Sequence, residues 1–463
     1  MIPLTLGEIA DAIGADVVGV DPGVRVTGPV EFDSRKVGRG GLFVAFPGEK
    51  VDGHDYAGVA IAAGAVAVLG SRPVQGVPML VVDDALTALG KLARAVRDRL
   101  PGLTVIGITG SSGKTTTKDF ISQLLAGLGE VVAPAGNLNN ELGLPYTMLQ
   151  ATGRTRYLVL EMGARGTGHV RYLCGIARPD VAIVVNVGVA HLGEFGSVDL
   201  IASAKSELVE SLGPDGMAVL NADDPRVRAM AERTPARVVL AGEAADAAYR
   251  AESVSLDDRG RAAYELVRAG ERAPVHLGVA GRHQVGNTLL AAAVAGELGM
   301  PLPDVAAGLS DLGLVSSRRM DVFDRADGVT VIDDSYNANP ASTAAALRAL
   351  ADLGRGRRTF AVLGYLAELG EYERAGHEEV GHLAAELGVH RLVVVGQPAG
   401  PIEAGAARVP GWGGKSVLVT DQDAAVAYLR GELRSGDVVL VKGSRYTTWE
   451  VADALRETAG AVA

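Results

Sequence analysis

A continuous apolar run that passes directly into a glycine-rich loop constrains the fold of this chain more than any other sequence feature. The run is Leu103–Thr109, and the loop reads Gly110-Ser111-Ser112-Gly113-Lys114-Thr115-Thr116-Thr117. A run without polar alternation is typical of a parallel strand that is buried on both faces. Helical spacing follows over residues 115–128. A strand, a tight loop and a helix in this order predict an α/β domain with a mostly parallel sheet.

The same order of strand, loop and helix returns along the chain and predicts three α/β domains. Residues 1–84 alternate short apolar runs with Gly- and Asp-rich turns, which indicates a small domain. Residues 85–315 hold the glycine-rich loop and predict a central P-loop-type domain, with a β excursion near residues 245–277. Residues 316–463 restart the pattern and predict a doubly wound, Rossmann-like domain.

Apolar spacing and the Gly and Pro residues that interrupt it predict the single elements. Helices are expected over residues 5–13, 86–100, 115–128, 200–212, 284–298, 341–353 and 377–387. Strands are expected over residues 41–46, 65–69, 103–109, 156–160, 180–187, 329–332, 360–363, 391–395 and 438–441. The 61 glycines and the low aromatic content of 4% suit layered α/β domains with tight turns.

Composition and charge exclude several classes of function. The net charge of −11 argues against binding to nucleic acid or to an anionic membrane surface. No apolar stretch is long enough for membrane insertion, and the first residues lack the pattern of a signal peptide, so we expect a cytoplasmic protein. The single cysteine, Cys174, excludes an intramolecular disulfide, and we expect it to be a buried packing residue.

The loop Gly110–Thr117 has the chemistry of a triphosphate site. Its glycines bring backbone N–H donors close to phosphate oxygens, and the following helix adds its positive end. Lys114 would neutralise the β and γ phosphates, and the Thr115 hydroxyl would bind Mg²⁺. The spacing departs from the ordinary Walker pattern, because Ile108 rather than glycine stands five residues before Gly113. A polar turn that contains Gly-Lys-Thr by chance is the alternative, and the strand-loop-helix context favours the phosphate site.

Two polar side chains follow later strands, where ligands of open α/β sheets collect. Glu161 ends an apolar strand and would hold Mg²⁺ beside the phosphates, unless it is a strand-end acid that faces solvent. His191 alone would be a structural hydrogen-bonding residue, whereas beside Glu161 and Lys114 it indicates a second metal site. Lys205, on the expected helix 200–212, is a solvated lysine on the sequence pattern alone.

These motifs together resemble the Mur ligases, and the resemblance covers nearly the whole chain. Thr109–Asp119 is similar to the ATP loop of that family, and Asn137–Pro145 to its asparagine-rich segment near substrate and nucleotide. Glu161-Met162-Gly163 and Asn186–His191 resemble its metal-binding strand ends. Lys205 lies where the family carries a lysine that CO₂ modifies to a carbamate, which would turn a cation into a Mg²⁺ ligand.

The C-terminal region resembles the member of the family that adds a dipeptide rather than a single amino acid. That resemblance rests on Asp334-Ser335-Tyr336-Asn337-Ala338-Asn339-Pro340. Arg319 sits where the family places an arginine that reaches ATP across the domain gap, and Asn287 matches an asparagine near the adenine. Lys442–Arg445 resembles the C-terminal loop of the family. At the N-terminus, Asp33-Ser34-Arg35 and Asp52-Gly53-His54 are similar to its UDP-sugar-binding turns.

The resemblance implies a role for each of these residues. The catalytic residues are Lys114, Lys205, His191, Asn337 and Asn339. The nucleotide is bound by Gly110, Ser111, Ser112, Gly113, Lys114, Thr115, Thr116, Asn287, Arg319 and Asp334. The muramoyl substrate is bound by Ser34, Arg35, Asn137 and Asn140. Two Mg²⁺ ions are held by Thr115, Glu161, His191 and Lys205.

Two segments depart from the family pattern. Gly281-Arg282-His283-Gln284 differs from the residues that usually precede Asn287. Gly364-Tyr365-Leu366-Ala367-Glu368-Leu369-Gly370 carries Tyr365 where the family has an aspartate. The second difference bears on the recognition of the acceptor.

The resemblance implies an ATP-dependent ligase that joins D-alanyl-D-alanine to UDP-N-acetylmuramoyl-tripeptide through an acyl phosphate. ATP and two Mg²⁺ ions are the implied cofactors, and we expect a monomer. A ligase of the same family that adds a single amino acid is the nearest alternative. A P-loop kinase is the alternative of another class, but it leaves the C-terminal unit and residues 334–340 without a use. A kinase would leave phosphate on its product, whereas a ligase would release it.

Overall fold

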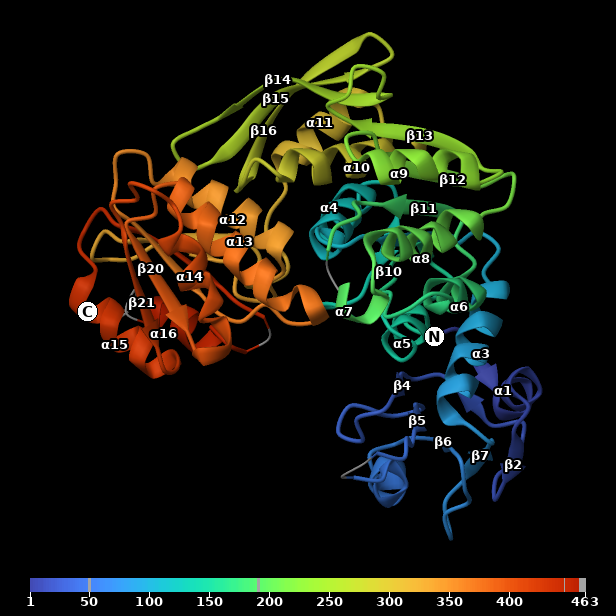
Figure 1. The fold of residues 1–463 in the computed structure, drawn as a ribbon. Helices are drawn as coiled ribbons and strands as arrows, with labels where there is room; N and C mark the ends of the chain where they lie inside the picture. The colour runs from blue at the N-terminus through green and yellow to red at the C-terminus, as the bar shows by residue number, and fades with distance from the viewer. Residues whose placement is uncertain (49–50, 190–191, 445, 458–463) are drawn as a thin grey trace.

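The computed structural model describes residues 1–48, 51–189, 192–444 and 446–457. Three separate groups of sheet and helix follow one another along the chain, and Figure 1 shows them as three bodies. The N-terminal body lies below the central one, and the C-terminal body lies beside it. The predicted α/β fold of three domains is therefore confirmed. Among the described residues, no helix has the length and apolar character needed to cross a bilayer.

The N-terminal domain contains a five-stranded sheet in the order β2-β7-β6-β5-β4. Its strands are β2 (Asp16–Val18), β4 (Val30–Glu31), β5 (Leu42–Val44), β6 (Ala67–Gly70) and β7 (Met79–Val81). A short antiparallel pair, β1 (Leu4–Thr5) and β3 (Arg25–Val26), and helices α1 (Leu6–Ile13) and α2 (Ala57–Ala62) complete it. Helix α3 (Ala85–Asp98) then leads into the central domain and packs against α5 and α6.

The central domain contains a nine-stranded sheet in the order β16-β15-β14-β13-β12-β11-β8-β10-β9. Neighbours are parallel from β9 to β14, and β14, β15 and β16 pair antiparallel. The strands are β8 (Thr104–Thr109), β9 (Glu130–Val132), β10 (Thr155–Glu161), β11 (Val181–Val184), β12 (Met217–Asn221), β13 (Arg237–Gly242), β14 (Tyr249–Leu256), β15 (Arg261–Arg268) and β16 (Glu271–Ala280).

Helices cover both faces of the central sheet, which explains the absence of alternation in its strands. One face packs against α4 (Lys114–Leu125), α10 (Gln284–Glu297) and α11 (Leu302–Ser310). The other packs against α3, α5 (Gly143–Met148), α6 (His169–Ala177) and α8 (Val198–Glu210). Alternate residues of β8 divide between these two cores: Val105 belongs to one, and Ile106 and Ile108 to the other.

The C-terminal domain contains a six-stranded sheet in the order β17-β18-β22-β19-β20-β21, parallel except for β17. Its strands are β17 (Asp321–Asp324), β18 (Thr330–Asp333), β19 (Thr359–Leu363), β20 (Arg391–Val395), β21 (Lys415–Val419) and β22 (Val438–Lys442). Helices α12 (Pro340–Leu353), α13 (Glu373–Glu386) and α14 (Pro401–Ala407) cover one face. Helices α15 (Gln422–Glu432) and α16 (Trp449–Glu457) cover the other.

The predicted elements are confirmed, with small shifts at their ends. The loosely defined excursion near residues 245–277 is the antiparallel extension β14–β16. Strand β11 ends at Val184 rather than at residue 187, because the chain leaves the sheet there to contact the glycine-rich loop. Helix α13 begins one turn earlier than predicted, at Glu373 rather than His377. The sequence pattern did not predict strands β1, β2, β3, β4, β7, β9, β12, β13, β17 and β21.

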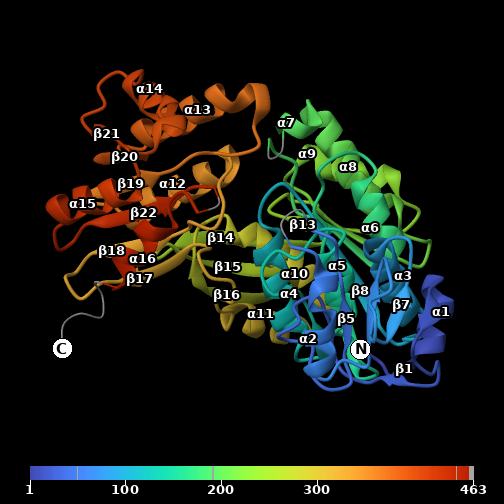
Figure 2. The same ribbon diagram turned by 90° about the horizontal axis from the view of Figure 1, so that it is seen from below.

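The central and C-terminal domains contact each other near residue 193 and at the β14–β15 turn, among other places. Short helix α7 (Leu192–Phe195) meets the turn before α13, where the Gly193 N–H donates to the Glu368 carbonyl at 3.2 Å. A Cβ at Gly193 would lie 2.5 Å from the Gly370 nitrogen, so the two backbones are in direct contact. At the β14–β15 turn, Arg259 pairs with Asp324 at 2.9 Å. Figure 2 shows β14–β16 lying between the two domains.

Candidate functional site

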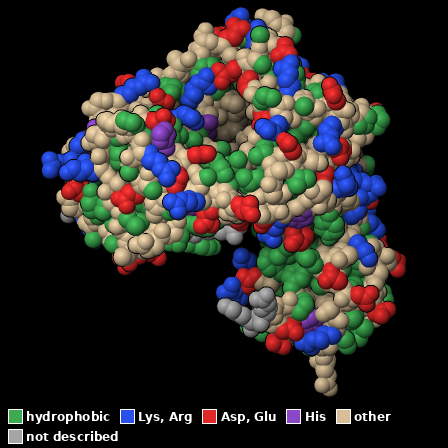
Figure 3. Space-filling view, viewed as in Figure 1, with side chains coloured by type: hydrophobic (Ala, Val, Ile, Leu, Met, Phe, Trp, Pro, Cys, Tyr) green, Lys and Arg blue, Asp and Glu red, His purple; other side chains and the backbone are tan. Residues whose placement is uncertain are grey.

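A cavity of ≈ 670 Å³ lies between the central and C-terminal domains. Figure 3 shows the molecule hollowed between these two bodies. The central domain supplies the loop between β8 and α4, the ends of β10 and β11, and the start of α10. The C-terminal domain supplies the segment before β17, the loop from β18 to α12, and residues after β22. The cavity therefore lies at the carboxyl edge of the central sheet, where ligands of α/β proteins bind.

The glycine-rich loop is held in shape by the segment that follows β11. The Asn186 side chain accepts a hydrogen bond from the Ser112 N–H at 2.9 Å and donates to the Ser112 carbonyl at 3.2 Å. The Ser111 hydroxyl accepts from the Gly188 N–H at 2.8 Å. Gly113 has φ 78°, and a Cβ there would lie 2.8 Å from the Asn287 side-chain oxygen, so only glycine fits. Helix α4 then begins at Lys114.

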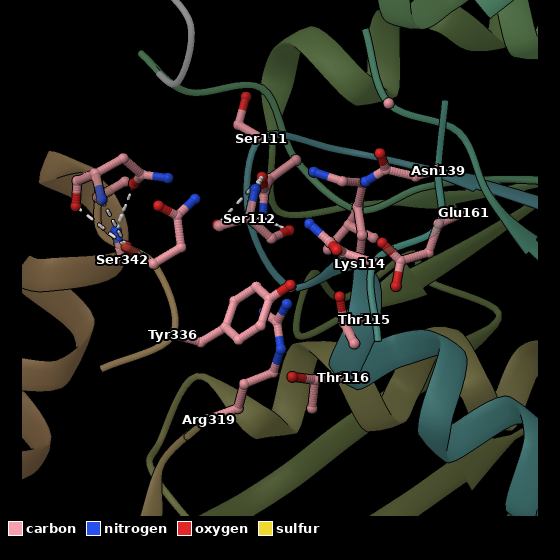
Figure 4. Close-up of a pocket in the computed structure, with 18 of the residues that line it drawn as sticks. Ser111, Ser112, Lys114, Thr115, Thr116, Asn139, Glu161, Arg319, Tyr336 and Ser342 are labelled. Carbon is pink, nitrogen blue, oxygen red and sulfur yellow. Dashed lines mark hydrogen bonds between the residues drawn. The ribbon is translucent and has the colours of Figure 1, made fainter. Parts of the chain in front are cut away.

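Three ionisable side chains lie together at this edge: Glu161 and Lys205, which are buried, and Lys114, which is half-buried. Glu161 is 1% exposed, and among the described residues neither of its carboxylate oxygens has a hydrogen-bond partner. The Lys114 ammonium donates to the Gly110 carbonyl at 2.7 Å; burial lowers its pKa, and the Glu161 charge opposes that shift. Figure 4 shows Lys114, Thr115 and Glu161 pointing toward one another. A buried carboxylate without hydrogen-bond donors is stabilised by a nearby cation, and its oxygens are suitable ligands for Mg²⁺.

Lys205 is buried beside this group, so its interpretation as a solvated lysine is wrong. Its side chain is 3% exposed, and α8 directs it into the cavity. Burial, together with the charge of Lys114, holds the pKa of Lys205 well below its usual range. The neighbouring Glu207 instead caps α6, accepting from the Gly168 and Arg171 N–H groups at 2.6 and 2.9 Å.

The C-terminal wall of the cavity carries a cation and an ion pair. The Arg319 guanidinium lies 4.3 Å from the centroid of the Tyr336 ring and faces the glycine-rich loop (Figure 4). Asp334 pairs with buried Lys442, and it also accepts from the Met320 N–H at 3.1 Å. Asn339 caps α12 by accepting from the Ser342 N–H at 2.9 Å, which fixes the end of the 334–340 segment.

Most of the predicted site residues line this one cavity. They are Ser111, Ser112, Gly113, Lys114, Thr115, Thr116, Asn137, Asn140, Glu161, Lys205, Asn287, Arg319, Asp334, Asn337 and Asn339. Gly110 contributes the carbonyl that accepts from Lys114. His191, and Arg445 of the C-terminal loop, lie outside the described residues.

Ser34 and Arg35 lie apart from the cavity, in the N-terminal domain. The Arg35 guanidinium is 85% exposed and pairs with Asp33 at 2.8 Å. That contact lowers the pKa of Asp33 to about 2. Ser34 is buried beneath this turn. The two predicted UDP-binding residues therefore belong to the N-terminal domain and do not line the cavity between the other two domains.

The two departures from the family pattern have different surroundings. Tyr365 is absent from the cavity lining; its hydroxyl donates to Glu373, and its ring stacks on His377 at 5.2 Å. The next segment still brings Ala367 and Glu368 to the cavity. His283 and Gln284 do line it, and Gln284 accepts from the Asn287 amide at 2.8 Å. Both segments therefore reach the site, whereas the Tyr365 side chain itself does not.

Several cavity residues were not selected from the sequence. Tyr336 and Asn139 lie inside motifs that were recognised, but nothing in the pattern separates them from their neighbours. Trp449 comes from the start of α16, more than a hundred residues from Tyr336, and no local spacing connects the two. The sequence places Lys442 in the C-terminal loop but does not predict its ion pair with Asp334. That pair forms because β18 and β22 are neighbours in the sheet.

Known proteins resemble this chain over its full length. The family models described as Mur ligase family catalytic domain, Mur ligase middle domain and Mur ligase glutamate ligase domain match residues 29–97, 108–295 and 318–445. The UDP-N-acetylmuramoyl-tripeptide--D-alanyl-D-alanine ligase of Mycobacterium tuberculosis is 49% identical over 509 residues, covering 100% of both chains. The chain belongs to the Mur ligase family.

Solved Mur ligases have the same fold. A crystal structure of MurF from Acinetobacter baumannii has a TM-score of 0.89 at 32% identity and covers 98% of this chain and 99% of its own. MurF from Thermotoga maritima, solved in complex with ADP, has a TM-score of 0.82 at 31% identity, covering 94% and 98%. Membership of the Mur ligases makes this chain an ATP-dependent ligase that forms a C–N bond.

Replacing Asn186 by alanine should weaken nucleotide binding by this Mur ligase. The change removes both hydrogen bonds that hold Ser112, so the loop loses its preformed shape. Losing one buried partner typically costs about 1–2 kcal/mol, which corresponds to roughly a tenfold higher Kd for ADP. Isothermal titration calorimetry measures the affinity, and thermal melting checks that the variant is folded. An unchanged ADP affinity would show that Asn186 does not shape the loop.

Proposed function

We propose that this chain adds D-alanyl-D-alanine to UDP-N-acetylmuramoyl-tripeptide in the synthesis of peptidoglycan precursors. The observation that carries the proposal is a single cavity in which the glycine-rich loop and Glu161 face Arg319 and the 334–340 segment. The M. tuberculosis relative, which is named for these substrates, supports the same reaction. The motif at residues 334–340, which resembles that of dipeptide-adding ligases, lines the acceptor side.

The first step activates a carboxylate. A carboxylate oxygen of the tripeptide attacks the γ-phosphorus of ATP, the bond to the β-phosphate oxygen breaks, and ADP leaves an acyl phosphate. Charge develops on the phosphoryl oxygens during this transfer. Lys114, at the start of α4, and Arg319, on the opposite wall, supply positive charge from both sides. The loop N–H groups orient the phosphates.

The second step forms the amide. The free amine of D-alanyl-D-alanine attacks the acyl carbon, a proton leaves the nitrogen, and the tetrahedral intermediate expels phosphate. Water would hydrolyse the acyl phosphate, so the cavity must exclude it during turnover. The contact between Gly193 and Gly370 joins the two domains near the cavity, and closure of this kind would limit such access. Asn337 and Asn339 belong to the wall that would receive the acceptor.

Magnesium fits the donors at the carboxyl edge of the sheet. Glu161 offers two buried oxygens without hydrogen-bond partners, and the Thr115 hydroxyl lines the same space. When bound, Mg²⁺ would lower the charge repulsion between the phosphates and the attacking carboxylate. Glu161 and Thr115 would hold one ion. Lys205 and His191 would hold the second, with Lys205 as a carbamate.

Carbamate formation on Lys205 is chemically reasonable at its position. Only an unprotonated amine attacks CO₂, and burial beside Lys114 lowers the pKa of Lys205. The product would be an anion among cations, which removes the unfavourable pairing of two lysines. The modification would therefore replace a repulsive contact with a metal ligand.

The N-terminal domain is the proposed site of the UDP group. Arg35 lies on its surface with Ser34 buried beside it, while Asn137 and Asn140 lie at the cavity, so one long substrate would connect the two. We take residues 1–84, 85–315 and 316–463 as the domains that bind the UDP-linked substrate, ATP and the acceptor. Because ATP and nucleotide-linked sugars are made inside cells, we place the reaction in the cytoplasm, with the enzyme as a monomer.

Purified protein should release phosphate only when ATP, Mg²⁺, UDP-N-acetylmuramoyl-tripeptide and D-alanyl-D-alanine are all present. The amide bond cannot form without both peptide halves, so omission of either one should abolish turnover. Coupled phosphate detection gives the rate, and mass spectrometry identifies the joined product. Preference for a single amino acid would point instead to another Mur ligase activity, and phosphate retained on the peptide would point to a kinase.

Replacing Glu161 by glutamine should raise the Mg²⁺ concentration that gives half-maximal turnover by about tenfold, since an anionic ligand becomes neutral. The readout is phosphate release over a Mg²⁺ titration. Glu130→Gln is the matched control, because Glu130 lies in the same sheet but bonds Thr152 and Thr155 outside the cavity. Equal Mg²⁺ requirements in all three proteins would refute the metal role of Glu161.

Replacing Gly193 by alanine should lower kcat by about fivefold and leave KM for the muramoyl substrate unchanged. The new methyl group would press on the Gly370 backbone and hold the domains apart at this point. Gly175→Ala serves as control, because a Cβ at that position of α6 meets no atom within 4 Å. Steady-state kinetics with varied muramoyl substrate separates the two constants. A rise in KM with kcat intact would contradict the closing role.

A further inference from the structure

Four side chains of the C-terminal domain are stacked from the cavity wall to helix α16. The Arg319 guanidinium lies 4.3 Å from the centroid of the Tyr336 ring. The Tyr336 and Trp449 rings are 5.9 Å apart with an interplanar angle of 33°. The Arg318 guanidinium lies 4.7 Å from the Trp449 ring. Each guanidinium lies over one of two neighbouring aromatic rings, which is favourable because the face of each ring is electron-rich.

The outer half of the stack is firmly anchored. The Trp449 indole N–H donates to the Ser335 carbonyl at 2.7 Å. The Arg318 guanidinium donates to both carboxylate oxygens of Asp453 at 2.7 and 2.9 Å, and to the Trp449 carbonyl at 3.2 Å. Because Nη2 of Arg318 is bonded to Asp453 and Nη1 to the Trp449 carbonyl, the plane of the guanidinium is fixed as well as its position. Trp449 is therefore held from its edge and from one face.

The inner end of the stack has no such anchor. Within the described part of the chain, the Arg319 guanidinium makes no hydrogen bond or ion pair. It makes a cation–π contact with the face of the Tyr336 ring. Its flanking residues, Arg318 and Met320, have φ of 58° and 54°, a backbone conformation that side chains other than glycine rarely adopt. Hydrogen bonds from Tyr336 N–H and Met320 N–H, both 3.1 Å long, hold this turn.

We propose that Trp449 and Asp453 are positioning residues for phosphoryl transfer, acting through Tyr336 on the Arg319 guanidinium. The inference rests on the proposed function, since Arg319 needs a triphosphate to act on. A long side chain without polar partners occupies many rotamers, and a stacked ring reduces them before ATP binds. Helix α16, which begins at Trp449, thus contributes to the ATP site without touching the phosphate loop.

The test compares the two tryptophans of the chain. Trp449→Leu should lower kcat about tenfold, with KM for UDP-N-acetylmuramoyl-tripeptide within about twofold, since a displaced guanidinium loses transition-state contacts. Trp449→Phe retains a ring and should stay within about threefold of the parent kcat. Trp412→Leu is the matched control, because Trp412 also donates to a backbone carbonyl, at 2.9 Å from Val389, but lies outside the cavity. It should change kcat by less than about twofold.

A double-mutant cycle separates positioning from general destabilisation. In an Arg319→Ala background, measured at raised enzyme concentration, Trp449→Leu should change kcat by less than about twofold, because its target is gone. Effects that multiply in the two backgrounds would overturn the proposal, as would an equal loss in Trp412→Leu. Asp453→Asn, at a half-exposed position, provides a second cycle if Trp449→Leu does not fold. It should lower kcat about threefold in the parent and not in Arg319→Ala.

The same phosphate-release assay distinguishes this inference from the function beneath it. If the parent protein joins the two peptide halves but the cycles are additive, the stack has no positioning role and the ligase assignment stands. If the parent protein joins nothing, the ligase assignment fails before any variant is compared.

Discussion

The burial of Glu161 next to Lys114, in reach of a third ionisable group at Lys205, is the constraint on which the site depends. A carboxylate that is 1% exposed and has no hydrogen-bond donor among the described residues is costly to keep ionised. Lys114 offsets part of that cost, but it lies in a loop shaped to receive phosphate. The proposed metal ion, together with the nucleotide, would complete the balance of charge at this edge and would link the stability of the site to its ligands.

The two walls of the cavity have complementary tasks. The central domain fixes the phosphates through a loop that Asn186 and Gly113 hold in one conformation. The C-terminal domain contributes the Arg319 guanidinium, which is carried on a long side chain. Stacking on the Tyr336 ring limits the conformational freedom of that side chain. The charge of Arg319 lowers the pKa of Lys114, and the charge of Glu368 raises it. The electric field at the glycine-rich loop therefore depends on the position of the C-terminal domain.

Sequence reasoning reached the parts of the site that are local in the chain. The apolar strand, glycine loop and helix around Lys114 form one continuous unit, so their spacing predicts both fold and chemistry. The sequence did not reveal that Lys205 is buried. A lysine has the same spacing relative to apolar residues on a helix between packed layers as on a helix at the surface. The direction of Tyr365, toward Glu373 and away from the cavity, depends on where α13 starts and was equally inaccessible. Trp449 and Tyr336 meet only because β18 and β22 are neighbours.

The meeting of Gly193 and Gly370 has a consequence for the end of the reaction cycle. Two glycine backbones form a contact without freezing any side-chain rotamer, and they expose almost no apolar surface when they part. The free-energy difference between touching and separated domains is therefore small at this point. A contact that opens at so little free-energy cost suits a ligase that must release its products before the next turnover. Those products are ADP, inorganic phosphate and a lengthened nucleotide-linked peptide.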